Sequence, residues 1–89
     1  MKIKLELFGA SREFSNKDYL EFNFKENISI SDFRKEIILY INKHFRNNEN
    51  FKKIVETSAF CNEDNNIIED NHRINKDQKI SIIPPIGGG

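Results

Sequence analysis

The residues with the clearest chemical potential close the sequence, which ends Pro84-Pro85-Ile86-Gly87-Gly88-Gly89. Proline fixes φ and lacks a backbone N–H, so the two prolines should end any preceding strand and direct the chain away from the domain. Glycine has no side chain, so its backbone can enter a narrow channel and leave a terminal carbonyl open to attack. We therefore expect a projecting tail that presents the α-carboxylate of Gly89 to another protein. The alternative is a frayed end without function, since chain termini are often disordered.

A carboxylate reacts with nucleophiles only after one of its oxygens has become a leaving group. Adenylation by ATP achieves this, and the acyl-adenylate then accepts sulfur to give a thiocarboxylate or an amine to give an amide. The rest of the sequence offers no competing chemistry, because it contains no P-loop, no Ser/His/Asp order and no paired carboxylates. His44 and His72 have no nucleophile or metal ligand at useful spacing, and a single Cys61 excludes an internal disulfide and a cysteine-based zinc site. We expect no metal and no permanently bound cofactor.

Size and charge point to a role that depends on a partner. The 89 residues form one domain, too small for a deep catalytic cleft of its own. Lys plus Arg and Asp plus Glu each number 14, without a basic cluster, which argues against nucleic acid. No apolar run approaches the roughly 18 residues of a membrane span, and the first residues alternate instead of forming a signal-peptide core. We expect a cytoplasmic protein without membrane contact.

Hydrophobic periodicity predicts the first half of the fold. Residues 2–8 and 19–24 alternate between apolar and polar side chains, as half-buried strands do, and residues 10–18 read as a turn or short loop between them. Ser29 is a candidate N-cap with Asp32 three residues later, followed by apolar residues at helical spacing. One long amphipathic helix should therefore cover residues 30–45.

The second half of the sequence has weaker signals. The expected elements are a helical turn near 51–55, short strands at 59–62 and 67–68, an irregular polar loop at 69–79 from which Ile74 enters the core, and a last strand at 79–83. The order ββαββ predicts an α+β protein with a β-grasp (ubiquitin-like) fold. A mixed sheet of four to five strands then packs on one main helix, with the last strand parallel to the first. The domain should comprise residues 1–83 and the tail residues 84–89.

Two apolar residues should face solvent beside the tail. If Ile3, Leu5 and Leu7 face the helix, Phe8 points outward at the end of the first strand, and Ile83 does so at the end of the last. On adjacent strands they would form a small patch of the kind that often marks protein contacts. Single exposed apolar residues are also common on protein surfaces, which is the alternative interpretation.

Two segments carry a family resemblance. The run Phe8-Gly9-Ala10-Ser11-Arg12-Glu13 is similar to the F-A-x-x-R-E segment after the first strand of the MoaD/ThiS family of sulfur carriers, most of all the small subunits of molybdopterin synthase. The ending Ile83-Pro84-Pro85-Ile86-Gly87-Gly88-Gly89 resembles the F-P-P-V-x-G-G ending of that family. The chain departs from the pattern at Asp77-Gln78-Lys79-Ile80, where the family has G-D-E-V, and at Ile83, where it has an aromatic residue.

The resemblance implies a pathway. An E1-like, MoeB-like enzyme would use ATP to adenylate Gly89, which would become a thiocarboxylate. The tail would then enter the MoaE-like large subunit of molybdopterin synthase, within a heterotetramer, and pass sulfur to the cyclic pyranopterin precursor to build the dithiolene of the molybdenum cofactor. The implied partner-binding residues are Phe8, Arg12, Ile83, Pro84, Pro85 and Ile86, and the residues that thread into the channel are Gly87, Gly88 and Gly89.

Three alternative functions, and one alternative role for Arg12, remain open from the sequence alone. A thiamin-thiazole sulfur carrier has the same fold and a diglycine end, although the segment 47–58 favours the molybdopterin branch over the shorter thiazole carriers. A ubiquitin-like modifier would form amides with lysines, and a plain β-grasp binding module would have an inert tail. For Arg12, the alternative to orienting the loop is a solvated ion pair with Glu13, which contributes little.

Overall fold

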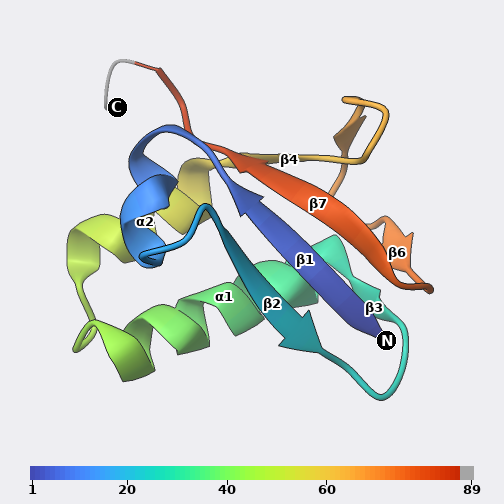
Figure 1. The fold of residues 1–89 in the computed structure, drawn as a ribbon, viewed down its shortest axis with the longest axis horizontal. Helices are drawn as coiled ribbons and strands as arrows, with labels where there is room; N and C mark the ends of the chain where they lie inside the picture. Colours follow the sequence, from blue (N-terminus) through green and yellow to red (C-terminus); the bar gives the residue numbers. More distant parts are fainter. Residues whose placement is uncertain (87–89) are drawn as a thin grey trace.

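A five-stranded mixed sheet organises the fold, and its strands follow the order β2-β1-β7-β4-β5 (Figure 1). The computed structural model describes residues 1–86. The strands of this sheet are β1 (Lys2–Leu7), β2 (Tyr19–Asn23), β4 (Ala59–Cys61), β5 (Ile67–Ile68) and β7 (Gln78–Ile83). The terminal strand β7 lies parallel to β1, whereas every other neighbouring pair is antiparallel. The predicted parallel pairing of the first and last strands is confirmed.

Helix α1 (Ile30–His44) packs on one face of the sheet, one residue shorter than predicted. Ser29 caps it as expected, since its hydroxyl accepts a hydrogen bond from the backbone N–H of Asp32 at 3.1 Å. The second helix, α2 (Glu49–Thr57), is longer than the single turn expected there. Asn48 explains its start, because its side-chain oxygen accepts a hydrogen bond from the N–H of Phe51 at 3.0 Å.

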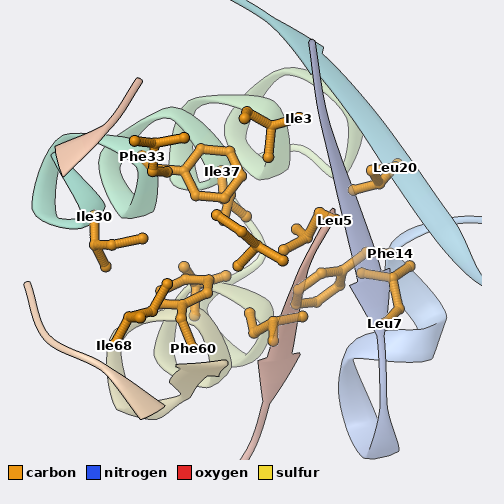
Figure 2. Packing of buried hydrophobic residues seen from close by; sticks show 14 of the residues in the cluster. Ile3, Leu5, Leu7, Phe14, Leu20, Ile30, Phe33, Ile37, Phe60 and Ile68 are labelled. Carbon is orange, nitrogen blue, oxygen red and sulfur yellow. The ribbon is translucent and has the colours of Figure 1, made fainter. Parts of the chain in front are cut away.

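The core lies between the inner face of the sheet and the helices, as Figure 2 shows. Ile3, Leu5 and Leu7 are buried, which confirms the predicted facing of the first strand. Ile80 and Ile82 of β7 are buried as well. The other members of the core are Phe14, Leu20, Ile30, Phe33, Ile37, Ile41, Val55, Phe60, Ile68 and Ile74. Burial of one face of each strand against α1 is what gives the two-layer β-grasp architecture that the sequence predicted.

Two segments predicted as irregular have regular structure. Residues 10–18 were expected to form a turn or loop, but a 3-10 helix, η1 (Gly9–Phe14), follows β1. Phe14, the last residue of η1, is fully buried. The centre of its ring lies 5.2 Å from the ring centre of Phe51 in α2. A short 3-10 helix leaves little periodicity in sequence, and the tertiary contact of Phe14 stabilises it.

The prediction of an irregular loop at 69–79 is wrong in its centre. There β6 (Arg73–Ile74) pairs antiparallel with β3 (Ile28–Ser29) in a second, two-stranded sheet. Ile74 is fully buried, as predicted, and the Nε of Arg73 donates to the side-chain oxygen of Asn27 at 3.1 Å. Strands of two residues are too short to show alternation, so only the folded chain reveals the pairing.

Arg34 of α1 connects three parts of the chain that are distant in sequence. Its Nη1 donates to the carbonyl oxygens of Val55 at 2.7 Å and Ser58 at 2.8 Å, and its Nη2 contacts Asp70 Oδ1 at 2.9 Å. The guanidinium also lies 4.7 Å from the ring centre of Phe60. These contacts satisfy carbonyls at the end of α2 and fix the connection from α2 to β4. No motif in the sequence marks Arg34 for this role.

Candidate functional site

Phe8 directly follows β1, and Ile83 is the last residue of the neighbouring strand β7, at the end of the sheet from which the tail departs. The parallel register of β1 and β7 pairs Leu7 with Ile82, so the next residues of both strands are adjacent. Leu7 and Ile82 are buried, whereas Phe8 is 43% exposed and Ile83 is 38% exposed. The exposure of both side chains agrees with the sequence prediction, and their contact with a partner stays a prediction.

The apolar surface extends further across the sheet than the predicted pair of Phe8 and Ile83. Ala59 pairs with Ile83, and Cys61 pairs with both Ser81 and Ile67. Because their neighbours Phe60 and Ile68 are buried, Ala59, Cys61 and Ile67 occupy the outer face, where Ile67 is 71% exposed. We call Phe8, Ile83, Ala59, Cys61 and Ile67 the outer strip. Residues 59–61 and 67–68 are apolar throughout and show no alternation in sequence, so the burial pattern and the strand order of the folded chain were needed to identify this surface.

The backbone that follows β1 holds Phe8 in place. The hydroxyl of Ser11 accepts a hydrogen bond from the N–H of Phe8 at 3.0 Å and donates to its carbonyl oxygen at 2.6 Å. Ser11 is fully buried. Gly9 has φ +56°, a conformation that favours glycine, and a Cβ at this position would lie 3.9 Å from the ring of Pro84. The segment Phe8–Ser11 therefore packs directly beside the start of the tail.

The tail begins where the prolines were expected to end the sheet. Strand β7 stops at Ile83, Pro84 is half-buried, and Pro85 and Ile86 are exposed. Figure 1 shows this segment leaving the sheet beyond the end of β1. The predictions for Gly87, Gly88 and Gly89, including their threading and the chemistry of the terminal carboxylate, concern residues outside the described part of the chain.

Comparison with known proteins defines the fold. No family model matches the chain, and no curated protein matches it. Among solved structures, SAMP1 from Haloferax volcanii matches 100% of both chains with a TM-score of 0.68 at 9% identity. A candidate molybdopterin converting factor, subunit 1, from Pyrococcus furiosus matches 96% of this chain and 98% of its own, with a TM-score of 0.68 at 18% identity. The chain has a ubiquitin-like β-grasp fold. This likeness over the full length agrees with the fold that the sequence predicted.

The remaining candidate residues, Arg12, His44 and His72, lie in three different parts of the domain. Arg12 is exposed in η1 and forms no ion pair with a side chain of residues 1–86, so the expected alternative of a pair with Glu13 is not found there. The ring centre of His44, in the last turn of α1, lies 4.3 Å from that of Tyr40 with the two planes tilted by 33°, and His72 is exposed in the loop before β6. Arg12 is the only one of these three that lies in the segment beside the tail.

Two structural findings bear on competing functions. Within residues 1–86, no three His, Cys, Asp or Glu side chains are arranged to hold a metal ion. No helix in this part of the chain has both the length and the apolar character that a membrane span needs. Cys61, the single cysteine, is a half-buried free thiol in β4.

Proposed function

We propose that this protein is a sulfur carrier of the MoaD/ThiS family and serves as the small subunit of molybdopterin synthase. The observation that carries the proposal is the position of the tail root. Strand β7 of a β-grasp domain ends at Ile83, and the sequence continues through two prolines to three glycines. Phe8 and Ile83 expose apolar surface beside that exit. The likeness in fold to the Pyrococcus furiosus protein supports the same function.

The proposed chemistry takes place at the α-carboxylate of Gly89. The carboxylate attacks the α-phosphate of ATP, which releases pyrophosphate and forms an acyl-adenylate. A sulfide nucleophile then adds to the acyl carbon and AMP leaves, so that one carboxylate oxygen is replaced by sulfur. The resulting thiocarboxylate is the sulfur donor for dithiolene formation. The carrier itself needs no bound metal or cofactor, because its partners supply ATP and the pyranopterin.

Each candidate residue has a role in this proposal. Gly87, Gly88 and Gly89 enter the active sites of an E1-like (MoeB-like) enzyme and of a MoaE-like large subunit, with which the carrier forms a heterotetramer in the cytoplasm. Arg12 orients the segment that follows β1. The residues proposed to contact partners are Phe8, Ile83, Pro84, Pro85 and Ile86. In this proposal the domain binds the partners, and the reactive group at Gly89 enters their active sites.

Intact-mass spectrometry tests the proposal. The full chain is incubated with its E1-like partner, ATP, Mg²⁺ and sulfide, and its mass should rise by about 16 units as sulfur replaces oxygen in the activated carboxylate. A chain that lacks Gly89 should not change in mass. Spectra of the untreated protein establish whether Gly89 is the terminal residue. The proposal fails if the truncated chain gains the same mass or the complete chain gains none.

A second assay separates the pathways. The thiocarboxylated chain should form molybdopterin when mixed with the molybdopterin synthase large subunit and the cyclic pyranopterin precursor. Transfer of sulfur to thiazole synthase instead would identify a thiamin-thiazole carrier. Amide adducts on lysines of other proteins would identify a ubiquitin-like modifier. A plain binding module would bind partners without any change in mass.

A further inference from the structure

A groove lies beside the root of the tail and is separate from the outer strip. Its volume is about 300 Å³, and its lining residues are Ala10, Asn50, Lys53, Ile54, Thr57, Pro84 and Pro85. Pro84 directly follows Ile83, so the groove and the outer strip meet at the start of the tail. Neither the sequence pattern nor the proposed role of Phe8 and Ile83 accounts for this feature.

One wall of the groove is a single face of α2. Asn50, Lys53, Ile54 and Thr57 are spaced i, i+3, i+4 and i+7, so their side chains share that face. The helix is held at both ends, by the Asn48 cap and by the hydrogen bonds that Arg34 donates to the carbonyls of Val55, in the last turn, and of Ser58, which directly follows the helix. The opposite wall is built from proline, whose ring restricts the backbone. Both walls are therefore preformed.

The groove combines an apolar lining with a positive charge. Ala10, Ile54, Pro84 and Pro85 provide the apolar atoms, and Lys53 is exposed. Lys53 forms no ion pair within residues 1–86, whereas the neighbouring Lys52 pairs with Glu49 at 3.1 Å. A ligand that matches this surface presents an apolar group together with a negative charge.

We propose that the groove receives an apolar side chain flanked by a carboxylate, carried by the E1-like protein that accepts the tail. This inference rests on the proposed function. A protein that admits the glycines into its active site must close around Pro84 and Pro85, because they immediately precede Ile86 and the glycines. Since those prolines also form a wall of the groove, the partner that covers them covers the groove. The E1-like protein then contacts the carrier at two sites, the outer strip and the groove.

Four variants of the full chain test the second site. Lys53→Glu reverses the charge, Lys53→Arg keeps it, and Ala10→Leu fills the groove from an exposed position in η1. Lys76→Glu is the matched control, because Lys76 is exposed in the loop before β7, about 20 Å of strand from the tail root. Calorimetry gives the Kd of each variant for the E1-like enzyme, and mass spectrometry gives the rate of sulfur addition at low and high salt.

The expected results differ between the variants. Lys53→Glu and Ala10→Leu should each raise the Kd about tenfold, as for loss of a contact worth ~1.4 kcal/mol, while Lys53→Arg and Lys76→Glu stay close to wild type. The effect of Lys53→Glu should shrink at high salt, because salt screens exposed charges.

Suppose that Lys53→Glu and Ala10→Leu bind the E1-like enzyme with the wild-type Kd while Phe8→Ala binds more weakly. This result would overturn the proposal that the groove contacts the partner and would leave the proposed function intact. A wild-type chain that gains no sulfur would contradict the proposed function itself. Dimers in sedimentation that Lys53→Glu abolishes would show that a second copy of this chain is the occupant, which would also overturn the inference.

Discussion

Ser11 holds both polar backbone groups of Phe8 with a single hydroxyl. Its Oγ accepts from the Phe8 N–H at 3.0 Å and donates to the Phe8 carbonyl oxygen at 2.6 Å. Phe8 has already left the ladder of β1, so these hydrogen bonds replace the strand pairing that ends at Leu7. The consequence is a defined position for the exposed Phe8 ring beside Ile83, which an unrestrained loop residue would lack.

The first prediction removes this hydroxyl. Ser11→Ala should lower the free energy of unfolding by about 1–3 kcal/mol, because in this partly buried segment the N–H of Phe8 loses its partner and the Phe8 carbonyl oxygen keeps only the backbone N–H of Ser11, at 3.2 Å. Chemical denaturation measures the change. Ser15→Ala is the control, since the Ser15 hydroxyl makes one exposed hydrogen bond, to the N–H of Lys17. Equal stability of Ser11→Ala and wild type would show that water replaces the hydroxyl without cost.

The second prediction contrasts Ile3 in β1 with Phe8, which directly follows that strand. Phe8→Ala should leave the melting temperature almost unchanged and weaken binding to the large subunit by more than about 1 kcal/mol, as for an aromatic anchor. Ile3→Ala should do the opposite, because Ile3 is fully buried and truncation in a core costs about 2–5 kcal/mol of stability. Thermal melts and calorimetry decide. Normal partner binding by a well-folded Phe8→Ala chain would exclude Phe8 from the interface.

The third prediction concerns the tail. Gly88→Val adds a branched side chain where the proposal requires a bare backbone, so sulfur transfer in the large subunit should stop while the fold stays intact. Single-turnover transfer assays measure the first effect and thermal melts the second. A Gly88→Val chain that transfers sulfur at the normal rate would show that glycine serves flexibility and not access.

The fourth prediction tests Arg34. Arg34→Met keeps most of the aliphatic stem but removes the hydrogen bonds to the Val55 and Ser58 carbonyls, so stability should fall by about 1–3 kcal/mol. Asp70→Asn should cost less than about 1 kcal/mol, because the Asp70 side chain is 63% exposed and surface ion pairs are weak. Urea unfolding compares the two. A larger loss in Asp70→Asn would mean that the ion pair, and not the carbonyl contacts, stabilises this region.

The fifth prediction concerns alkaline pH. Burial raises the pKa of the Tyr40 phenol above its ordinary value of 10.0, and its hydroxyl donates to the Phe14 carbonyl at 3.0 Å. The folded state therefore holds this proton more tightly than the unfolded state. Its contribution to stability is complete below pH 10 and is lost as the pH rises above that value. The decline above pH 10 should be shallower in Tyr40→Phe than in wild type. Identical pH profiles for wild type and Tyr40→Phe would rule out this contribution.

Local sequence was sufficient for the elements with clear periodicity. The alternation around Ile3, Leu5 and Leu7 placed one face of the first strand in the core, and Ser29 marked the start of α1 to the residue. Both signals are local, because a strand with one buried face has period two and a helix start needs a capping side chain. The exposure of Phe8 and Ile83 followed from the same alternation. The chemistry expected at Gly89 was inferred from the prolines and glycines of the tail and stays a prediction.

Only the tertiary structure decided how these elements meet. The pairing of β3 with β6 and the burial of Phe14 depend on residues that are far apart in sequence and carry no period of their own. Arg34 illustrates the reason, because its carbonyl partners lie more than twenty positions away in the chain. Nothing in the local sequence distinguishes Arg34 from other long polar residues on the helix. The groove beside Pro84 likewise exists only because α2, η1 and the end of β7 pack together. Sequence thus determined which faces of the first strand and of α1 are buried, whereas long-range packing determined the surfaces around the start of the tail.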